Sequence, residues 1–123
     1  MDTQTIPLQA SDLTYFTGSE HWYTHPLIRS ITYTDGVKYV ADKAGAYWLI
    51  DEVATNQLDR KISAEEFQVW KLVVNREKST AVLTCEDGDY NEVFRKDIDF
   101  TDFPLPEITL WYTNRTILLP SEY

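Results

Sequence analysis

The sequence contains few residues that could form disulfides, flexible hinges or metal sites. Its 123 residues include one cysteine, two histidines, four glycines and five prolines, and no two glycines or prolines are adjacent. A single cysteine excludes an intramolecular disulfide and is typical of a reducing compartment. Because no glycine-rich or proline-rich stretch separates two parts of the chain, we expect a single domain over residues 1–123.

Long apolar runs are also missing. The longest, Ala44–Ile50, has seven residues even when Gly45 is counted, and a membrane helix needs about 20. The first residues lack the basic start and apolar core of a signal peptide. We therefore expect a cytoplasmic protein that makes no membrane contact.

Basic residues are scarce as well. Eleven Lys and Arg face twenty Asp and Glu, which gives a formal net charge of −9. Proteins that bind phosphate backbones or anionic lipids carry clustered Lys and Arg. No such cluster is present, so direct nucleic-acid binding is not expected.

The excess of acids is concentrated between Glu86 and Glu107, a stretch named here the acidic segment. It holds eight acidic residues against Arg95 and Lys96. One hypothesis is that it mimics a nucleic acid and occupies a basic protein; the other is that it is an ordinary solvated face. Mimicry requires one contiguous surface. The candidate residues for that surface are Glu86, Asp87, Asp89, Glu92, Asp97 and Asp99.

Catalytic and metal-binding motifs are lacking. There is no Gly-x-Ser-x-Gly elbow, P-loop, Gly-x-Gly-x-x-Gly or Cys-x-x-Cys. Asp87–Asn91 resembles the start of a calcium loop, but Glu92 stands where glycine is needed and Ile98 where a glutamate is needed, so we expect a polar turn. Cys85 precedes two acids, which disfavour a thiolate, and it alternates with apolar residues as a core residue would.

Local patterns predict mostly strands. Residues 29–34 and 37–40 are rich in β-formers around Asp35-Gly36, which indicates a tight hairpin. The spacing of apolar residues predicts one helix over 43–58, and a short helical turn is expected at Ser11–Phe16. The remaining expected strands are 67–74, which we place in the centre of the sheet, 80–85, 92–100, 107–113 and 116–119, with a turn at Asn114-Arg115.

These elements predict an α+β fold: a mainly antiparallel sheet of about seven strands with one substantial helix packed on one face. The alternative is a sheet that curls into a small cupin-like β-barrel with the helix at one end. Periodicity does not separate these two architectures.

The two histidines are the candidate chemical centre, because imidazoles are the usual neutral-pH bases and metal ligands. Pro26 moves His25 out of helical geometry. In a strand, His21 and His25 would lie roughly 13 Å apart, so neither regular structure makes a chelate. A metal site would need a carboxylate from elsewhere, and the candidates are Glu20, Asp51 and Glu52.

Aromatic residues make up 14% of the chain. Exposed Trp and Tyr with a polar rim are typical of protein-binding patches. The alternative is that the N-terminal segment folds over Trp48 and hides it. The candidate binding surface consists of His21, Trp22, Tyr23, His25 and Trp48.

The strings FTGSEHWYTHPLIRSITYTDGVKYVADKAGAYWLIDEVA, EEFQVWKL, LTCEDGD and FPLPEITLWYTNRTILLPSEY resemble a family of small, uncharacterised bacterial proteins that also occur on plasmids and in phages. The resemblance covers nearly the whole chain. It implies a free-standing cytosolic protein and an accessory role in mobile DNA, but it brings no activity, cofactor, partner or functional residue with it.

The sequence therefore predicts a non-catalytic protein-binding module without a cofactor. It would act through the aromatic surface or through the acidic segment, on an unidentified protein partner or on a second copy of itself as a homodimer. The alternative is a small metal-dependent enzyme or ligand binder that uses His21 and His25 with a carboxylate.

Overall fold

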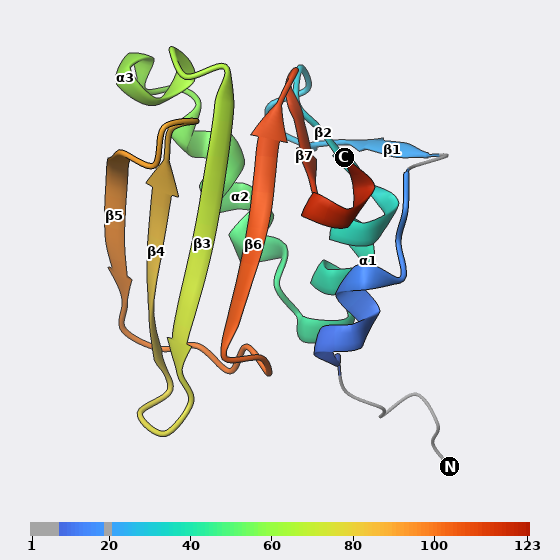
Figure 1. Cartoon of the computed structure of the whole chain (residues 1–123), viewed down its shortest axis with the longest axis vertical. Helices are drawn as coiled ribbons and strands as arrows, with labels where there is room; N and C mark the ends of the chain where they lie inside the picture. The colour runs from blue at the N-terminus through green and yellow to red at the C-terminus, as the bar shows by residue number, and fades with distance from the viewer. Residues whose placement is uncertain (1–7, 19–20) are drawn as a thin grey trace.

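The computed structural model describes residues 8–18 and 21–123. Their strands form one open, seven-stranded sheet in the order β1-β2-β7-β6-β3-β4-β5 (Figure 1). All neighbours are antiparallel except β2 and β7, which are parallel. The strands are β1 (Trp22–Thr24), β2 (Thr32–Thr34), β3 (Phe67–Asn75), β4 (Thr80–Glu86), β5 (Glu92–Ile98), β6 (Glu107–Thr113) and β7 (Thr116–Leu118).

The α-helices of the described chain are α1 (Asp35–Ala44), α2 (Tyr47–Asn56) and the short α3 (Arg60–Ser63), and two 3-10 turns, η2 (Ala10–Thr14) and η3 (Pro120–Glu122), lie beside α1. In the view of Figure 1, α2 crosses behind the sheet, α1 lies beside β7 and α3 lies at the upper end of the sheet. In the described part of the chain, no helix has the length and apolar character to span a bilayer.

The α+β prediction is confirmed, and the alternative of a closed barrel is wrong. As expected, β3 is an interior strand of the sheet, between β6 and β4. Asn114 and Arg115 form the turn between β6 and β7 with φ of 57° and 59°, the geometry of a tight hairpin turn.

The hairpin predicted around Asp35-Gly36 is wrong, because α1 begins at Asp35. Thr34 is the N-cap, and its side chain accepts a hydrogen bond from the Val37 backbone. Gly36 is needed for a reason that local sequence does not reveal. A Cβ at this position would lie 2.7 Å from Oε1 of Glu122, so the glycine allows the 120–122 segment to approach.

The single helix predicted over 43–58 is also wrong, because two helices occupy this region. Gly45 ends α1 in the left-handed conformation, with φ 62° and ψ 37°, and glycine adopts that conformation at no steric cost. The chain then restarts as α2 at Tyr47. Lys43 and Ala44 therefore belong to the end of the first helix.

The structure also corrects two smaller predictions near the N-terminus. The turn predicted at Ser11–Phe16 is η2, which starts one residue earlier and has Gln9 rather than Ser11 as its N-cap. No strand was predicted around Trp22, but Trp22–Thr24 pairs with β2 as an edge strand. The count of seven strands is unchanged, because this strand replaces the one expected at 37–40.

Alternation along the central strands divides the sheet into two faces. The inner face packs on the helices and carries Trp70, Leu72, Leu83 and Leu110, which are all buried. The other side is named here the outer face. Among the described residues no α-helix lies over it, but the 3-10 turn η3 lies against its β2 and β7 side, where Thr34 donates a hydrogen bond to Glu122. From burial and register the outer face carries Trp22, Phe67, Val69, Lys71, Val73, Val82, Thr109, Trp111 and Leu118.

Candidate binding surfaces

His25 is a buried structural residue, with 1% of its surface exposed. Its Nδ1 accepts hydrogen bonds from the backbone N–H groups of Leu27 and Ile28, at 3.2 and 3.0 Å. Nδ1 is therefore unprotonated, so Nε2 carries the hydrogen and donates it to Oδ1 of Asp51 at 2.8 Å. Both ring nitrogens are occupied in shaping the loop between β1 and β2. Neither is free to act as a general base or a metal ligand.

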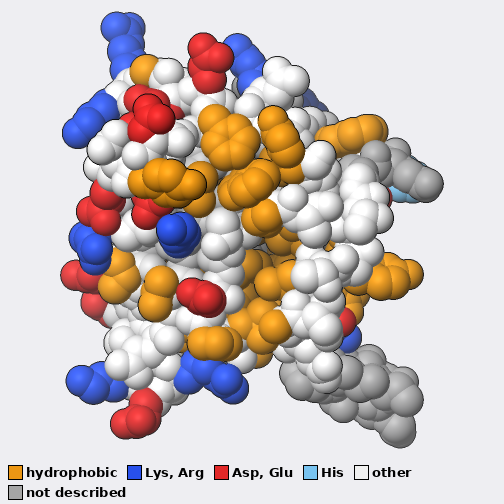
Figure 2. All heavy atoms as spheres, in the orientation of Figure 1, with side chains coloured by type: hydrophobic (Ala, Val, Ile, Leu, Met, Phe, Trp, Pro, Cys, Tyr) orange, Lys and Arg blue, Asp and Glu red, His pale blue; other side chains and the backbone are white. Residues whose placement is uncertain are grey.

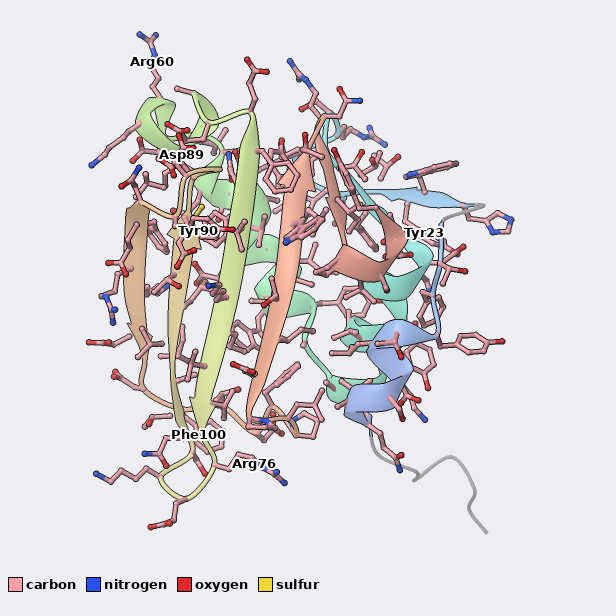
Figure 3. All side chains as sticks on the ribbon, viewed as in Figure 1. Tyr23, Arg60, Arg76, Asp89, Tyr90 and Phe100 are labelled. Carbon is pink, nitrogen blue, oxygen red and sulfur yellow. The ribbon has the colours of Figure 1, made fainter. Side chains whose placement is uncertain are left out.

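His21 lies in a different polar cluster at the start of α1. Its Nδ1 is 3.5 Å from Oδ2 of Asp35, and the hydroxyl of Tyr23 donates to Oδ1 of the same carboxylate at 2.8 Å. These bonds hold the pKa of Asp35 below its ordinary value, chiefly through Tyr23. Nζ of Lys38 lies 5.5 Å from the centre of the Tyr23 ring. Figure 3 labels Tyr23 at the β1 side of the molecule.

The two histidines therefore bind different carboxylates and do not converge. In the described residues, no group of three or more His, Cys, Asp or Glu side chains could hold a metal ion. Glu20 lies outside the described residues, and Glu52 forms an ion pair with Lys96 instead of approaching either imidazole. The geometry does not favour the metal-dependent alternative.

The aromatic residues of the predicted surface are separated as well. Trp22 is 57% exposed on the outer face, where it borders a hollow of about 250 Å³ together with Tyr123. Trp48 is half-buried on α2 and lines a different hollow, beside residues 96–102. His21, Trp22, Tyr23, His25 and Trp48 thus do not make one patch.

The acidic segment does not form one surface either. Asp87 and Asp89 lie in the turn before β5, whereas Asp97 and Asp99 lie at its other end. Figure 3 shows this separation, with Asp89 at the upper end of the sheet and Phe100 at the lower end. Basic side chains interrupt the segment, because Lys71 pairs with Glu86 and Arg95 with Glu92. This arrangement does not support mimicry of a nucleic acid.

One part of the acidic segment does meet a predicted aromatic residue. A hollow of about 460 Å³ lies between α2 and the segment that runs from β5 towards Asp102. We name it the Trp48 hollow. Its lining residues are Gly45, Trp48, Glu52, Lys96, Asp97, Ile98, Asp99, Phe100, Thr101 and Asp102.

The outer face carries an aromatic cluster that the sequence did not identify. The rings of Phe67, Trp111 and Tyr123 contact one another edge to face, with centroids 5.2, 5.8 and 5.4 Å apart. In Figure 2, which shows this face, hydrophobic side chains gather over β3 and β6. Alternation places Phe67 on the same side of β3 as Val69 and Val73. It cannot show that no α-helix covers these residues, or that Tyr123 folds back onto Phe67.

Two expectations about polar residues are confirmed. Cys85 is buried, and desolvation raises the pKa of its thiol to about 12, so it is no nucleophile at neutral pH. Asp87 closes a polar turn, because its carboxylate accepts hydrogen bonds from the backbone N–H groups of Asp89 and Asn91.

Comparisons with known proteins give a family but no activity. Neither the curated proteins nor the solved structures contain a match to this chain. The model of the family described as "Family of unknown function (DUF6876)" matches residues 8–123. The chain therefore belongs to this family, whose function is unknown.

Proposed function

We propose that the protein is a non-catalytic module that binds another protein through the outer face of its sheet. The single observation that carries this proposal is that no α-helix of the described residues lies over the face, although it holds the Phe67–Trp111–Tyr123 cluster. Exposed apolar patches with aromatic side chains and a polar rim are typical of protein-binding sites.

The exposure of individual side chains supports this assignment. Trp22 is 57%, Val73 is 54% and Tyr123 is 76% exposed, although each could contribute to a core if it were covered. Lys71 with Glu86 and Arg95 with Glu92 form ion pairs on the same side of the sheet. The patch therefore has the apolar centre and charged surroundings of an interface.

We also propose that the protein acts in the bacterial cytoplasm, as an accessory protein of mobile DNA. The free, buried thiol of Cys85 is compatible with a reducing compartment. The resemblance to small proteins of plasmids and phages supports the accessory role.

The test uses two variants that change the outer face without touching the core, Val73→Lys and Trp22→Ser. The control is Leu58→Ser, which removes a side chain that is 74% exposed at the end of α2. Proteins retained from a host lysate on each immobilised variant are quantified by mass spectrometry. Binding of each retained protein is then measured by calorimetry with purified components.

We expect one partner that binds the wild type and Leu58→Ser equally and binds the two outer-face variants at least about tenfold more weakly, since a hot-spot side chain contributes 2 kcal/mol or more by the usual ~1.4 kcal/mol per decade. Equal binding of all four proteins would refute the assignment to the outer face. If light scattering detects a wild-type dimer that Val73→Lys abolishes, the partner that binds the outer face is a second copy of this chain.

A further inference from the structure

The Trp48 hollow combines apolar walls with an acidic rim. Trp48 comes from the first turn of α2, and Ile98 and Phe100 come from the end of β5 and the following loop. Its volume of about 460 Å³ lies within the range of sites that enclose small ligands or peptide side chains. An acidic stretch alone would be an ordinary solvated face, so the indole inside the hollow is the distinguishing feature.

The charges around the hollow are not balanced within the described chain. Lys96 is the only cation among the lining residues, and its Nζ is already 2.5 Å from Oε2 of Glu52. Asp99 and Asp102 follow the end of β5, are exposed and have no ion pair with any described residue. Asp97 also lines the hollow, but it is opposite Val82 in the β4–β5 register, so its side chain leaves the strand on the outer-face side. Two unpaired carboxylates at the rim of an aromatic hollow are complementary to a cation.

The indole of Trp48 can contact a cation and can also donate a hydrogen bond, and a peptide offers partners for both interactions. Trp48 is half-buried, and its Nε1–H donates to no acceptor among the described residues. An indole face attracts a cation, and its N–H can donate to a backbone carbonyl. A guanidinium group is planar, stacks on aromatic rings and pairs with carboxylates through two parallel hydrogen bonds, whereas an ammonium group is a compact, strongly hydrated charge.

We propose that the Trp48 hollow is a second binding site, which takes an arginine side chain that a partner protein presents. The guanidinium stacks on the indole of Trp48 and pairs with the carboxylates of the rim. This proposal does not depend on the outer-face assignment, because Val73 and Trp22 lie on that other face and do not line the hollow.

The test follows the indole N–H signals of the ¹⁵N-labelled protein by NMR. The signal of Trp48 is assigned by its loss in Trp48→Phe. The probe is a capped Gly-Arg-Gly peptide, and the matched control is the same peptide with citrulline, which keeps the shape of arginine without its charge. Capped Gly-Lys-Gly and spermidine form two further arms.

We expect the arginine peptide to shift the Trp48 signal in a saturable manner, and to bind at least about tenfold more tightly than the citrulline peptide, because charge-assisted bonds are roughly twice as strong as neutral ones. The lysine peptide should bind more weakly than the arginine peptide. Equal binding of arginine and citrulline, or a shift confined to other tryptophans, would refute the proposal. If spermidine binds as tightly as the arginine peptide, the site takes any cation and the assignment to arginine is wrong.

A charge-matched pair of variants separates the rim from the overall charge of the protein. Asp99→Asn with Asp102→Asn should weaken binding of the arginine peptide by about tenfold or more at 0.15 M salt. The control set, Glu66→Gln with Asp89→Asn, removes the same number of charges from exposed positions outside the hollow and should weaken binding by less than about threefold, since distant charges are screened at this salt concentration. Similar losses in both sets would show that no local site exists.

Discussion

At the scale of single residues, the tightest constraint on this fold involves Glu122 and Gly36. The buried Glu122 carboxylate accepts hydrogen bonds from the Thr34 hydroxyl at 2.6 Å, the Gly36 N–H at 3.0 Å and the Leu119 N–H at 2.9 Å. It thereby satisfies donors at the first turn of α1, where a negative charge is also favoured by the helix dipole.

Gly36→Ala tests this contact. The new Cβ would lie within 2.7 Å of Oε1 of Glu122 and of Cδ1 of Leu119, so the 119–122 segment must move and the buried carboxylate loses hydrogen bonds. We expect the free energy of unfolding to fall by about 2 to 4 kcal/mol, as measured by urea denaturation. Gly88→Ala, where a Cβ meets nothing within 4 Å, should change it by less than about 0.5 kcal/mol.

Gln68 provides a second residue-scale test. Its buried amide exchanges hydrogen bonds with Gln57, donates to the carbonyl of Ile62 and accepts from Nε1 of Trp70. Gln68→Leu should destabilise the protein by about 2 to 4 kcal/mol, because several buried groups lose their partners at once. Gln57→Leu should cost less, since Gln57 is partly exposed and water can replace it. Equal losses would mean that the network is not buried.

The reactivity of the Cys85 thiol tests whether this side chain is buried. With a thiol pKa of about 12, the native protein should not react with Ellman's reagent at pH 8, where the thiol remains protonated. Unfolding in guanidinium chloride should expose one reactive thiol per chain. Rapid reaction of the folded protein would contradict the packing of β4 against the helices.

At the scale of elements, sequence patterns predicted the long strands well and the helical region poorly. β3, β4 and β6 were predictable as strands because each is long and alternates. The pairing of β3 with β4 follows from the short turn between them, whereas β6 comes after β5 in the chain and yet pairs with β3. Asp35-Gly36 misled the prediction because a glycine in a short polar pair is usually a turn residue. The role of Gly36 is instead set by its contact with Glu122, which is 86 residues away in the sequence. No local pattern predicts that contact.

The candidate surfaces were predictable only in part, for a similar reason. Trp48 could be placed off the apolar side of its helix, and Asp97 and Asp99 could be placed in an acidic segment. Their meeting in one hollow depends on how β5 lies beside α2, which is a tertiary feature. The contact of Tyr123 with Phe67 and Trp111 has no local signal at all.

The helix α1 carries an electrostatic cluster whose behaviour can be tested. Asp42 accepts hydrogen bonds from Lys38 at 2.8 Å and from the Tyr47 hydroxyl at 2.5 Å. These bonds lower the pKa of Asp42 below its ordinary 3.8, chiefly through Lys38, and raise the pKa of Tyr47 to about 12. The stabilisation from ionised Asp42 is therefore present above about pH 4 and is lost as the pH falls through the lower native pKa.

We expect Lys38→Met to raise the pKa of Asp42 most, and Tyr47→Phe to raise it by a smaller amount, in a carboxyl-carbon NMR titration. Both variants should lose less stability than the wild type between pH 4 and pH 2. Tyr90→Phe, which removes the hydroxyl of a tyrosine that is 83% exposed, should match the wild type. An unchanged Asp42 titration in Lys38→Met would contradict the ion pair.

At the scale of the whole molecule, the open sheet leaves two edges, β1 and β5. β5 is the longer one, and its exposed charges, Arg95, Lys96 and Asp97, are of the kind that discourages pairing between copies at a free strand. Arg95→Val with Asp97→Val keeps the net charge constant and should cause aggregation at 37 °C, followed by light scattering. Lys38→Ala with Asp42→Ala, also neutral overall but on α1, should not, even where it lowers stability.

The parallel pairing of β2 with β7 also determines when this chain can complete its fold during synthesis. β3, β4 and β5 can pair with one another once Ile98 has left the ribosome, and β6 then adds to β3, but Thr32 and Tyr33 must wait for Thr116 and Ile117. Contacts of such long sequence separation slow folding. Until then the β1–β2 pair has no link to the rest of the sheet, and a translation product that stops before β7 would expose the apolar side of α1 to chaperones and proteases.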